Sequence, residues 1–250
     1  MSRPPFAPGD IEAIERATLA AVLPEAVAEI PGWLLPFDRG TVGRARSAVP
    51  VLHTVPDLSV LGAIEVQYRA HRLPAVFRIP DSPSFDAFRA ALAGRGYTGS
   101  KPTEVHTAAT ASVQAVAPPA ADVMAQPDEG WEQVFLGEGF DPVDGASRVR
   151  ILRRASGTLF ASMRERGRTV AAGALACAHG WASVHGMRTA QAWRDRGLAA
   201  QVLATLAMAA DSRGYPRMFL QVEAHNAPAQ ALYRRAGFKR VWTYVYWKQP

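Results

Sequence analysis

The stretch Arg194-Asp195-Arg196-Gly197-Leu198-Ala199 joins a segment that favours a strand to one that favours a helix. Residues 181–189, just before it, are rich in β-forming side chains. After it, apolar side chains recur at every fourth position from Leu198 to Ala210, which predicts one buried helix face. The first turn of a helix has free N–H groups and the positive end of the dipole, and a glycine there admits a ligand. The stretch therefore predicts an anion site, and the expected anion is a phosphate or pyrophosphate.

Composition places this chain of 250 residues among ordinary globular proteins, with length for one large domain or two small ones. The formal net charge is +6, but the arginines are scattered and not clustered with aromatic residues, so we expect no nucleic-acid partner. No apolar run approaches the roughly 20 residues that span a membrane, and residues 1–5 lack the apolar part of a secretory signal. Cys177 is the single cysteine, which excludes an internal disulfide and a cysteine-based metal site. We therefore expect a cytoplasmic protein with no membrane partner and no metal site.

Two halves with a similar order of elements flank the alanine- and proline-rich segment 115–121. This segment has the composition of a linker, so we predict domains at 1–127 and 128–250. Both halves end in strand, helix, strand, helix, a glycine–aromatic pair and a strand, the pairs being Gly96-Tyr97 and Gly237-Phe238. This shared order indicates a tandem duplication, although two unrelated α/β pieces remain the alternative.

Two motifs in the second half resemble the signatures of the GNAT superfamily of N-acetyltransferases. Arg194-x-x-Gly197-x-Ala199, after a strand and at the start of a helix, resembles the family's acetyl-CoA pyrophosphate loop. The segment 220–238 resembles the second signature through Leu220, Val222, Glu223, Asn226, Ala229, Leu232, Tyr233, Gly237 and Phe238. The resemblance covers about 159–247 and implies an α/β (α+β) fold with a mixed, mostly antiparallel sheet flanked by helices. The first half resembles a degenerate copy of the same fold.

The resemblance implies that acetyl-CoA is the cosubstrate and contacts three segments. The backbone N–H groups from Arg196 to Ala200 would hold its pyrophosphate, while Arg194 and Arg196 add positive charge or remain solvated. Asn226, just before Pro228, is a good N-cap, and in the family its side chain also meets the pantetheine arm. The full set of expected cofactor contacts is Met187, Arg188, Thr189, Arg194, Asp195, Arg196, Gly197, Leu198, Ala199, Ala200, Asn226, Ala229 and Tyr233.

The implied reaction is direct transfer, in which a neutral amine attacks the thioester carbonyl and the CoA thiolate leaves. Tyr233 is the expected proton donor to the thiolate, because phenol and thiol have reasonably matched pKa values. A backbone N–H near Met187 would stabilise the oxyanion. Glu223 and His185 are alternative candidates for the base that deprotonates the amine, and His225 is a weaker one. Since no covalent enzyme intermediate is needed, Cys177 is expected to be a small core residue.

The first half departs from the cofactor motif. Residues 57–68 contain no R-x-x-G-x-A/G turn, and Leu92 stands where the second half has Tyr233. We therefore expect this half not to bind acetyl-CoA but to supply walls of the acceptor pocket. Trp33, Phe37 and Arg46 are candidates for that role, with a core position favoured for the two aromatic residues.

The expected acceptor is a primary amine of a small molecule, an amino acid or a peptide, and the protein is expected to be a monomer or a homodimer. Two other function classes compete with an N-acetyltransferase. One is a non-catalytic module that binds or senses CoA. The other is a Rossmann-type nucleotide-binding protein, which is disfavoured because a second glycine is missing before Gly197.

Overall fold

The computed structural model describes residues 6–7 and 9–250, and its strands form two sheets. The smaller sheet contains β1 (Ala26–Ile30), β2 (Trp33–Phe37) and β3 (Val49–Pro50), in that order. The larger sheet contains β4 (Val76–Pro80), β5 (Thr98–Ala109), β6 (Asp122–Met124), β7 (Leu159–Glu165), β8 (Arg168–Ala178), β9 (Trp181–Thr189), β10 (Arg217–Glu223) and β11 (Lys239–Lys248). Its strand order is β4-β11-β5-β10-β9-β8-β7-β6. Only β9 and β10 are parallel among these described pairs, which confirms the mixed, mostly antiparallel sheet.

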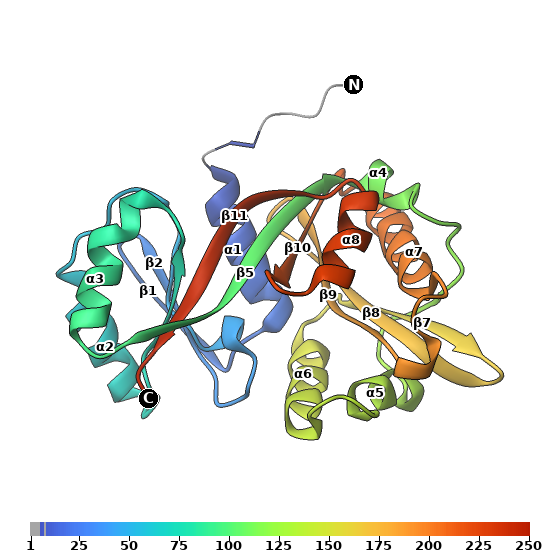
Figure 1. The fold of residues 1–250 in the computed structure, drawn as a ribbon, viewed down its shortest axis with the longest axis horizontal. Coiled ribbons are helices and arrows are strands. Elements are labelled where there is room, and N and C mark those ends of the chain that lie inside the picture. Colours follow the sequence, from blue (N-terminus) through green and yellow to red (C-terminus); the bar gives the residue numbers. More distant parts are fainter. Residues whose placement is uncertain (1–5, 8) are drawn as a thin grey trace.

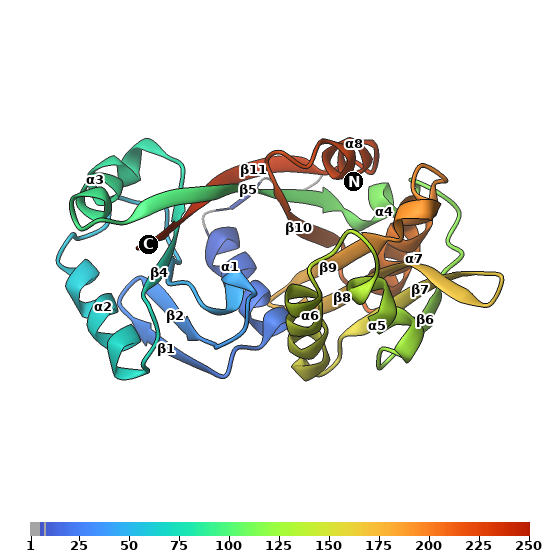
Figure 2. The same cartoon turned by 60° about the horizontal axis from the view of Figure 1, so that its bottom comes forward.

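Helices cover both faces of the larger sheet. They are α1 (Gly9–Val22), α2 (Val60–Ala70), α3 (Asp86–Gly94), α4 (Thr110–Gln114), α5 (Glu129–Leu136), α6 (Pro142–Arg154), α7 (Leu198–Ser212) and α8 (Ala227–Arg235), with short 3-10 turns η1 (Gly43–Ala45), η2 (Pro83–Phe85) and η3 (Gln191–Trp193). Figure 1 shows α7 and α8 at one end of the molecule, and α2 and α3 at the other. Figure 2 shows α8 on one side of β5 and β11, with α1, α5 and α6 on the opposite side.

Alternate side chains of single strands enter separate cores on the two faces, as the pleat of a strand requires. Leu220 and Val222 of β10 pack in the cluster that includes α7. Phe219, between them, packs with Ile14 of α1 and Trp181 of β9 on the opposite face. The central strands are therefore covered on both sides, and only their ends are free to form a ligand site.

Strands of the two predicted domains pair with each other in the larger sheet. β5, from residues 1–127, pairs with β10, while β11 pairs with both β4 and β5. Figure 2 shows β5 and β11 running side by side across the length of the molecule. The domain boundary at 127/128 therefore stays a prediction. Both ranges contribute strands to one sheet, so the sheet itself does not divide the chain at this point.

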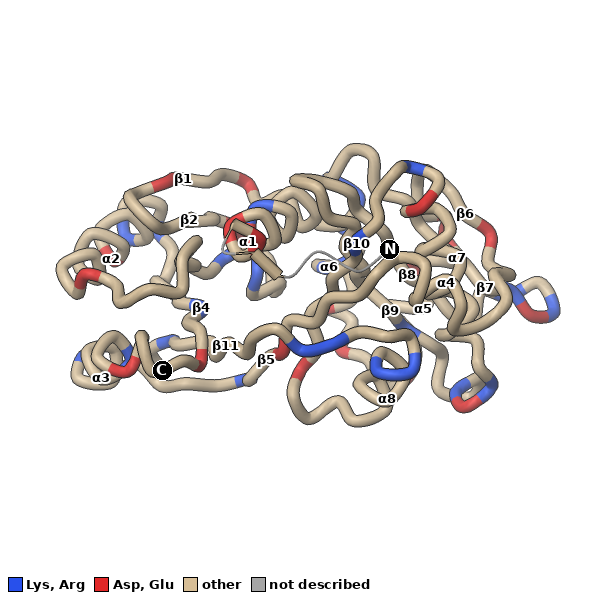
Figure 3. The backbone as a smooth tube through the Cα atoms, turned by 90° about the horizontal axis from the view of Figure 1, so that it is seen from above, with Lys and Arg blue, Asp and Glu red and all other residues tan. Residues whose placement is uncertain are grey.

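Several local predictions are confirmed. β7 and β8 form a hairpin with its turn at Arg166 and Gly167, whose φ angles are +50° and +76°, and the sequence Arg166-Gly167-Arg168 between two apolar runs predicts such a turn. Gly214, with φ +77°, follows the last turn of α7, as its place just after the apolar helix pattern predicts. In contrast, α5 begins where only a domain boundary was expected, and Asp128 is its N-cap, accepting from the Trp131 N–H at 2.7 Å. Lys and Arg positions are spread over the length of the molecule (Figure 3).

Candidate active site

β9 and β10 lie side by side for only part of their length and then diverge. Their pairing runs from Met218 opposite Ala182 to Leu220 opposite Val184. Beyond that point β9 remains paired with β8, and β10 with β5. We call the diverging ends, residues 185–189 and 221–223, the fork. The facing edges of the fork carry backbone groups that are not paired with each other, so an extended ligand can enter between them.

A bulge in β9 accompanies the opening of the fork. The β8–β9 register shifts here, so that Gly186 and Met187 together face Gly173. Gly186 has φ +60°, and a Cβ at this position would lie 3.0 Å from the ring of Phe135. A Cβ on Gly173 would lie 2.6 Å from the sulfur of Met187. Gly186 thus supplies the left-handed backbone of the bulge, and Gly173 leaves room for the Met187 side chain opposite it.

The predicted strand–turn–helix unit is confirmed by β9, the loop after it and α7. Gly197 is the N-cap of α7, with φ +77°, and a Cβ built on it meets nothing within 4 Å. Within the described chain, the N–H groups of residues 195–199 donate to no acceptor. Ala200, which belongs to the predicted set, donates instead to the Gly197 carbonyl at 3.0 Å. Free amides at a helix N-terminus, reached past a glycine, are suited to an anion.

The two arginines of this loop are exposed and make local contacts. The Arg194 Nε lies 3.5 Å from the carbonyl oxygen of Thr189. The Arg196 guanidinium lies 4.6 Å from the centre of the Trp193 ring and donates to the Ala192 carbonyl at 3.2 Å. Neither is in an ion pair within the described residues, so their positive charge is available to an anion at the α7 N-terminus.

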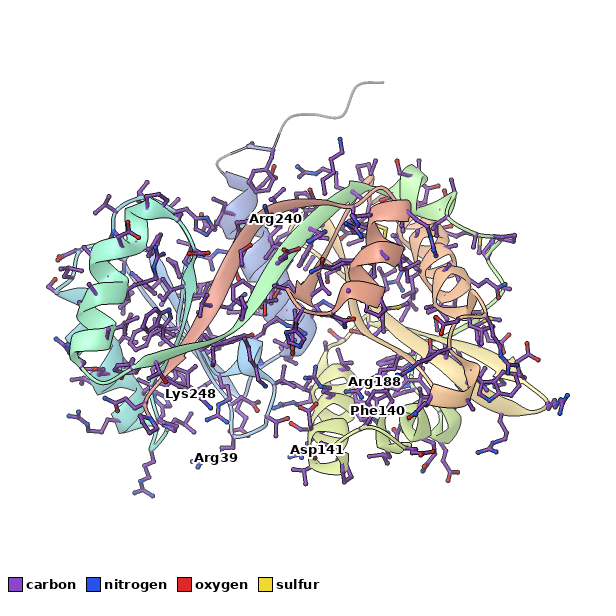
Figure 4. The ribbon with its side chains drawn as sticks, in the orientation of Figure 1. Arg39, Phe140, Asp141, Arg188, Arg240 and Lys248 are labelled. Atoms are coloured by element: carbon purple, nitrogen blue, oxygen red, sulfur yellow. The ribbon has the colours of Figure 1, made fainter. Side chains whose placement is uncertain are left out.

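Arg188 points away from α7. Its guanidinium carbon lies 3.9 Å from the ring centre of Phe140 and 5.1 Å from that of Phe135, and a terminal nitrogen lies 3.7 Å from Asp144. Burial lowers the pKa of Arg188 to about 10. Figure 4 shows Arg188 and Phe140 next to each other. A cofactor contact of Arg188, as predicted, would therefore come from its backbone, as for its neighbours on the fork edge, Met187 and Thr189.

α8 carries two predicted residues in suitable positions. The side chain of Asn226 accepts from the Ala229 N–H at 3.2 Å, which confirms it as the N-cap. Tyr233 is buried against Phe238, with ring centres 5.9 Å apart. Burial raises the pKa of Tyr233 to about 12. Its hydroxyl has no hydrogen-bond partner in the described structure, so the phenol is protonated at neutral pH and free to donate.

His185 stands at the apex of the fork on β9 and is buried. Its Nε2 lies 2.8 Å from the Ser183 hydroxyl, which itself donates to the Ala176 carbonyl. The imidazole must therefore donate its Nε2 proton to Ser183. Burial, assisted by the charge of Arg44, lowers the pKa of His185 to about 3. His185 is neutral at physiological pH, and it is a weak base.

Glu223 ends β10 and is more accessible. Its side chain is 43% exposed and lies 3.1 Å from the Nε2 of His225, which is 73% exposed. Glu223 follows Gln221 at the two-residue period of a strand, so both side chains lie on the face of β10 that carries Phe219. This places a solvent-accessible carboxylate at the mouth of the fork and an amide at its apex.

Gln221 has a role that its sequence position alone does not predict. Its Nε2 donates to the Thr18 hydroxyl of α1 at 2.9 Å, and its Oε1 accepts from the Tyr244 hydroxyl at 2.8 Å. The Tyr244 hydroxyl lies 3.4 Å from that of Tyr246. Gln221 therefore connects the fork to α1 and β11. Its alternation with Glu223 was the signal in the sequence, but the partners come from distant segments.

The residues proposed from the first half lie mainly in its core. Trp33 stacks on Phe88 at 5.2 Å, and Phe37 stacks on His71 at 3.7 Å, between ring centres. These two aromatic residues are buried, as favoured from the sequence. Arg46 donates to the Gly40 carbonyl at 3.1 Å and holds the loop after β2.

Cys177 and Leu92 occupy packing positions. Cys177 is half-buried on β8 beside the α7 core, and burial raises the pKa of its thiol. The Leu92 carbonyl accepts from the Tyr97 N–H at 3.1 Å, just as the Tyr233 carbonyl accepts from the Phe238 N–H at 3.0 Å. Leu92 and Tyr233 are therefore equivalent by backbone geometry, as the glycine–aromatic pairs predicted.

Solved structures with this architecture include N-acetyltransferases of the GNAT class. A GCN5-related N-acetyltransferase from Kribbella flavida is 18% identical, with a TM-score of 0.70 over 98% of this chain and 97% of that one. A GCN5-related N-acetyltransferase from Sphaerobacter thermophilus is 18% identical, with a TM-score of 0.56 over 98% and 93%. A tandem GNAT protein from the clavulanic acid biosynthesis pathway is 13% identical, with a TM-score of 0.58 over 95% and 94%. The chain therefore has the GNAT fold.

The family can be stated more narrowly. A family model described as "Probable histone acetyltransferase Rv0428c C-terminal" matches residues 8–247, and the chain belongs to this family. A search of curated proteins gave no match. Among the described helices, none combines the length and the apolar character needed to cross a membrane.

Proposed function

We propose that this protein transfers an acetyl group from acetyl-CoA directly to a primary amine of a small molecule, an amino acid or a peptide. The observation that carries the proposal is the α7 N-terminus, where free N–H groups and a left-handed Gly197 adjoin the fork. Family membership supports acetyl transfer, and the site geometry supports acetyl-CoA as the donor.

The site residues fit the chemistry of the donor. Its diphosphate would be held by the N–H groups of residues 196–199 and by the charges of Arg194 and Arg196, because these groups are not neutralised within the protein. The fork edges would pair with the amide groups of the pantetheine arm. When bound, acetyl-CoA supplies an activated acetyl group as a thioester.

We assign the proton transfers to two residues. A C–N bond forms and the thioester C–S bond breaks, so the amine loses a proton and the thiolate gains one. Tyr233 is the proposed donor, since its hydroxyl is protonated and free. Glu223 is the proposed acceptor, through water, because it is accessible at the fork. His185 is less suited, since its pKa of about 3 makes it a poor base at neutral pH.

We propose that the first half is a degenerate copy without a donor site. At the position of Tyr233 it has Leu92, which has no proton to give. Its helix α2 begins at Val60, after Ser59, with no glycine at the N-cap. In the second half, α7 has Gly197 there, with a left-handed conformation. The first half therefore contributes to the acceptor side of the molecule.

Two measurements test the proposed function. Titration calorimetry should show binding of acetyl-CoA but not of ATP or NAD, and binding of either nucleotide in its place would reject the assignment. Thiol release in the presence of a panel of amines should show turnover. Binding of acetyl-CoA with no thiol release from any amine would favour a CoA-binding or sensing module.

A further inference from the structure

Arg44, in the turn η1, is a cation without an ion-pair partner among the described residues; the carboxylate on which its charge acts, Glu15, is paired with Arg78. Arg44 makes no hydrogen bond or ion pair within residues 6–7 and 9–250. Its Nε is buried and has no partner, while the residue as a whole is half-buried. The two terminal nitrogens of Arg44 are not among the buried atoms and also have no partner in the described chain, so an acceptor from outside can reach them and lower the cost of the partly buried charge. This makes Arg44 a marker for a ligand that the protein does not itself supply.

The packing of the preceding residue and the effect of its own charge place Arg44 near the apex of the fork. A Cβ on Gly43, the preceding residue, would lie 2.8 Å from the ring of Tyr246, so η1 rests directly on that ring. Tyr246 contacts Tyr244, whose hydroxyl donates to Gln221. Arg44 is also close enough to His185 for its charge to lower the pKa of that imidazole. The turn therefore brings a cation from the first half to the catalytic end of β9 and β10.

Other arginines around this site have a carboxylate as ion-pair partner. Glu15 of α1 and Arg78 of β4 are buried and form an ion pair at 2.6 Å. On the α6 side, Arg154 pairs with Asp38 at 2.6 Å, and Asp144 is shared by Arg148 and Arg188. The groups next to Arg44 are His185, which is neutral, the half-buried Tyr246, whose pKa is raised by burial, and Glu15, on which the charges of both Arg78 and Arg44 act. One positive charge is therefore left over at the apex of the fork.

We propose that Arg44 binds a carboxylate of the acceptor, so that the substrates are amines that also carry a carboxylate, such as free amino acids. The inference rests on the proposed function and names the acceptor class of the same site. A guanidinium matches a carboxylate in shape and charge, and charge-assisted hydrogen bonds of this kind are strong. The same charge repels polyamines and lysine-rich peptides, because the single carboxylate of Glu15, paired with Arg78, faces two arginines.

The test compares acceptors that differ only in the carboxylate. A mixture of the common amino acids and a matched mixture of their C-terminal amides are each assayed by thiol release. The variants are Arg44→Gln, which removes the charge, and Arg44→Lys, which keeps it. Arg39→Gln is the matched control. Arg39 is an exposed arginine that lies, like Arg44, between β2 and β3, and it has no partner in the described chain. Figure 4 shows Arg39 at the lower edge of the molecule, away from the helices α7 and α8.

We expect the wild-type protein to prefer the acids over the amides by at least about tenfold in kcat/KM. Arg44→Gln should remove this preference through a higher KM for the acids, with the amides changed by less than about twofold. Arg44→Lys should keep part of the preference, and Arg39→Gln should keep all of it. Equal turnover of acids and amides, or an equal loss of both in Arg44→Gln, would overturn the inference.

A binding experiment separates this inference from the proposed function. N-acetylated amino acids, which are the expected products, are titrated into the protein with CoA present. Binding that is lost in Arg44→Gln and kept in Arg39→Gln supports the carboxylate site even if no turnover is seen. Absence of such binding in the wild-type protein, together with acetylation of polyamines or basic peptides, would refute the carboxylate site and leave the acetyltransferase assignment intact.

Discussion

Gly197 and Gly214 lie at opposite ends of α7 and form a matched pair of positions. Each has φ +77°, and a Cβ built on either meets nothing within 4 Å. Replacement by alanine should therefore cost only the left-handed backbone strain, about 1–2 kcal/mol in each case. For a chain of this length that corresponds to a fall in Tm of roughly 2–8 °C. The two variants should remain folded and should be destabilised to a similar extent.

The two variants should differ in acetyl-CoA affinity. In Gly197→Ala, the new methyl group occupies the open space in front of the free amides, where the diphosphate is expected. Loss of one charge-assisted hydrogen bond weakens binding by about tenfold to 100-fold. Gly214→Ala lies beyond the far end of the helix and should leave the Kd unchanged. Titration calorimetry measures the Kd, and thermal denaturation measures the Tm. An equal effect of both variants on the Kd, or none for Gly197→Ala, would refute the anion site.

Three further predictions follow from buried groups. Tyr233→Phe should lower kcat by about 100-fold or more while leaving the acetyl-CoA Kd unchanged, measured by thiol release and calorimetry; an unchanged kcat would remove Tyr233 from the reaction. His185 has a folded pKa of about 3 against 6.5 when unperturbed, so the unfolded state binds more protons between these values and stability falls as pH drops through that window. His185→Gln should flatten this part of the curve of Tm against pH, and a curve parallel to that of the wild type would contradict the assignment. Gly145→Ala should destabilise by roughly 1–3 kcal/mol in urea unfolding, because its Cβ would overlap the Phe135 carbonyl. Gly62→Ala, in open space on α2, should stabilise by roughly 0.5–1 kcal/mol, and the same sign for both would count against this packing.

Helix ends and caps of the site could be predicted from the sequence, because they depend on contacts between residues that are close in the chain. A glycine that must adopt a positive φ, such as Gly197 or Gly214, marks a helix end by itself. Asn226 caps α8 through a contact three residues away. The fork could be expected only through the family resemblance, since its geometry depends on a bulge between β8 and β9.

Long-range features could not be predicted from the pattern of residues. The Arg188 side chain lies over the ring of Phe140, because a cation over an aromatic ring is stable. The two residues are far apart in the sequence, so no local motif predicts this contact. Arg44 looked like one of many scattered arginines, since its lack of a partner is visible only in the folded chain. Asp128 was assigned to a boundary because an N-cap and a linker end have the same composition.

The exchange of strands explains how the first half can act on the site without binding the donor. β5 pairs along β10 from Arg217 to Glu223, so it supports the edge of the fork that carries Gln221. β11 lies between β4 and β5 and presents Tyr246, on which η1 rests. The turn that holds Arg44 is thus positioned by a strand that belongs to the second half by sequence. Because backbone pairing fixes this arrangement along whole strands, the acceptor side cannot shift relative to the fork without breaking the sheet, which favours a rigid acceptor site over one that closes by movement of domains.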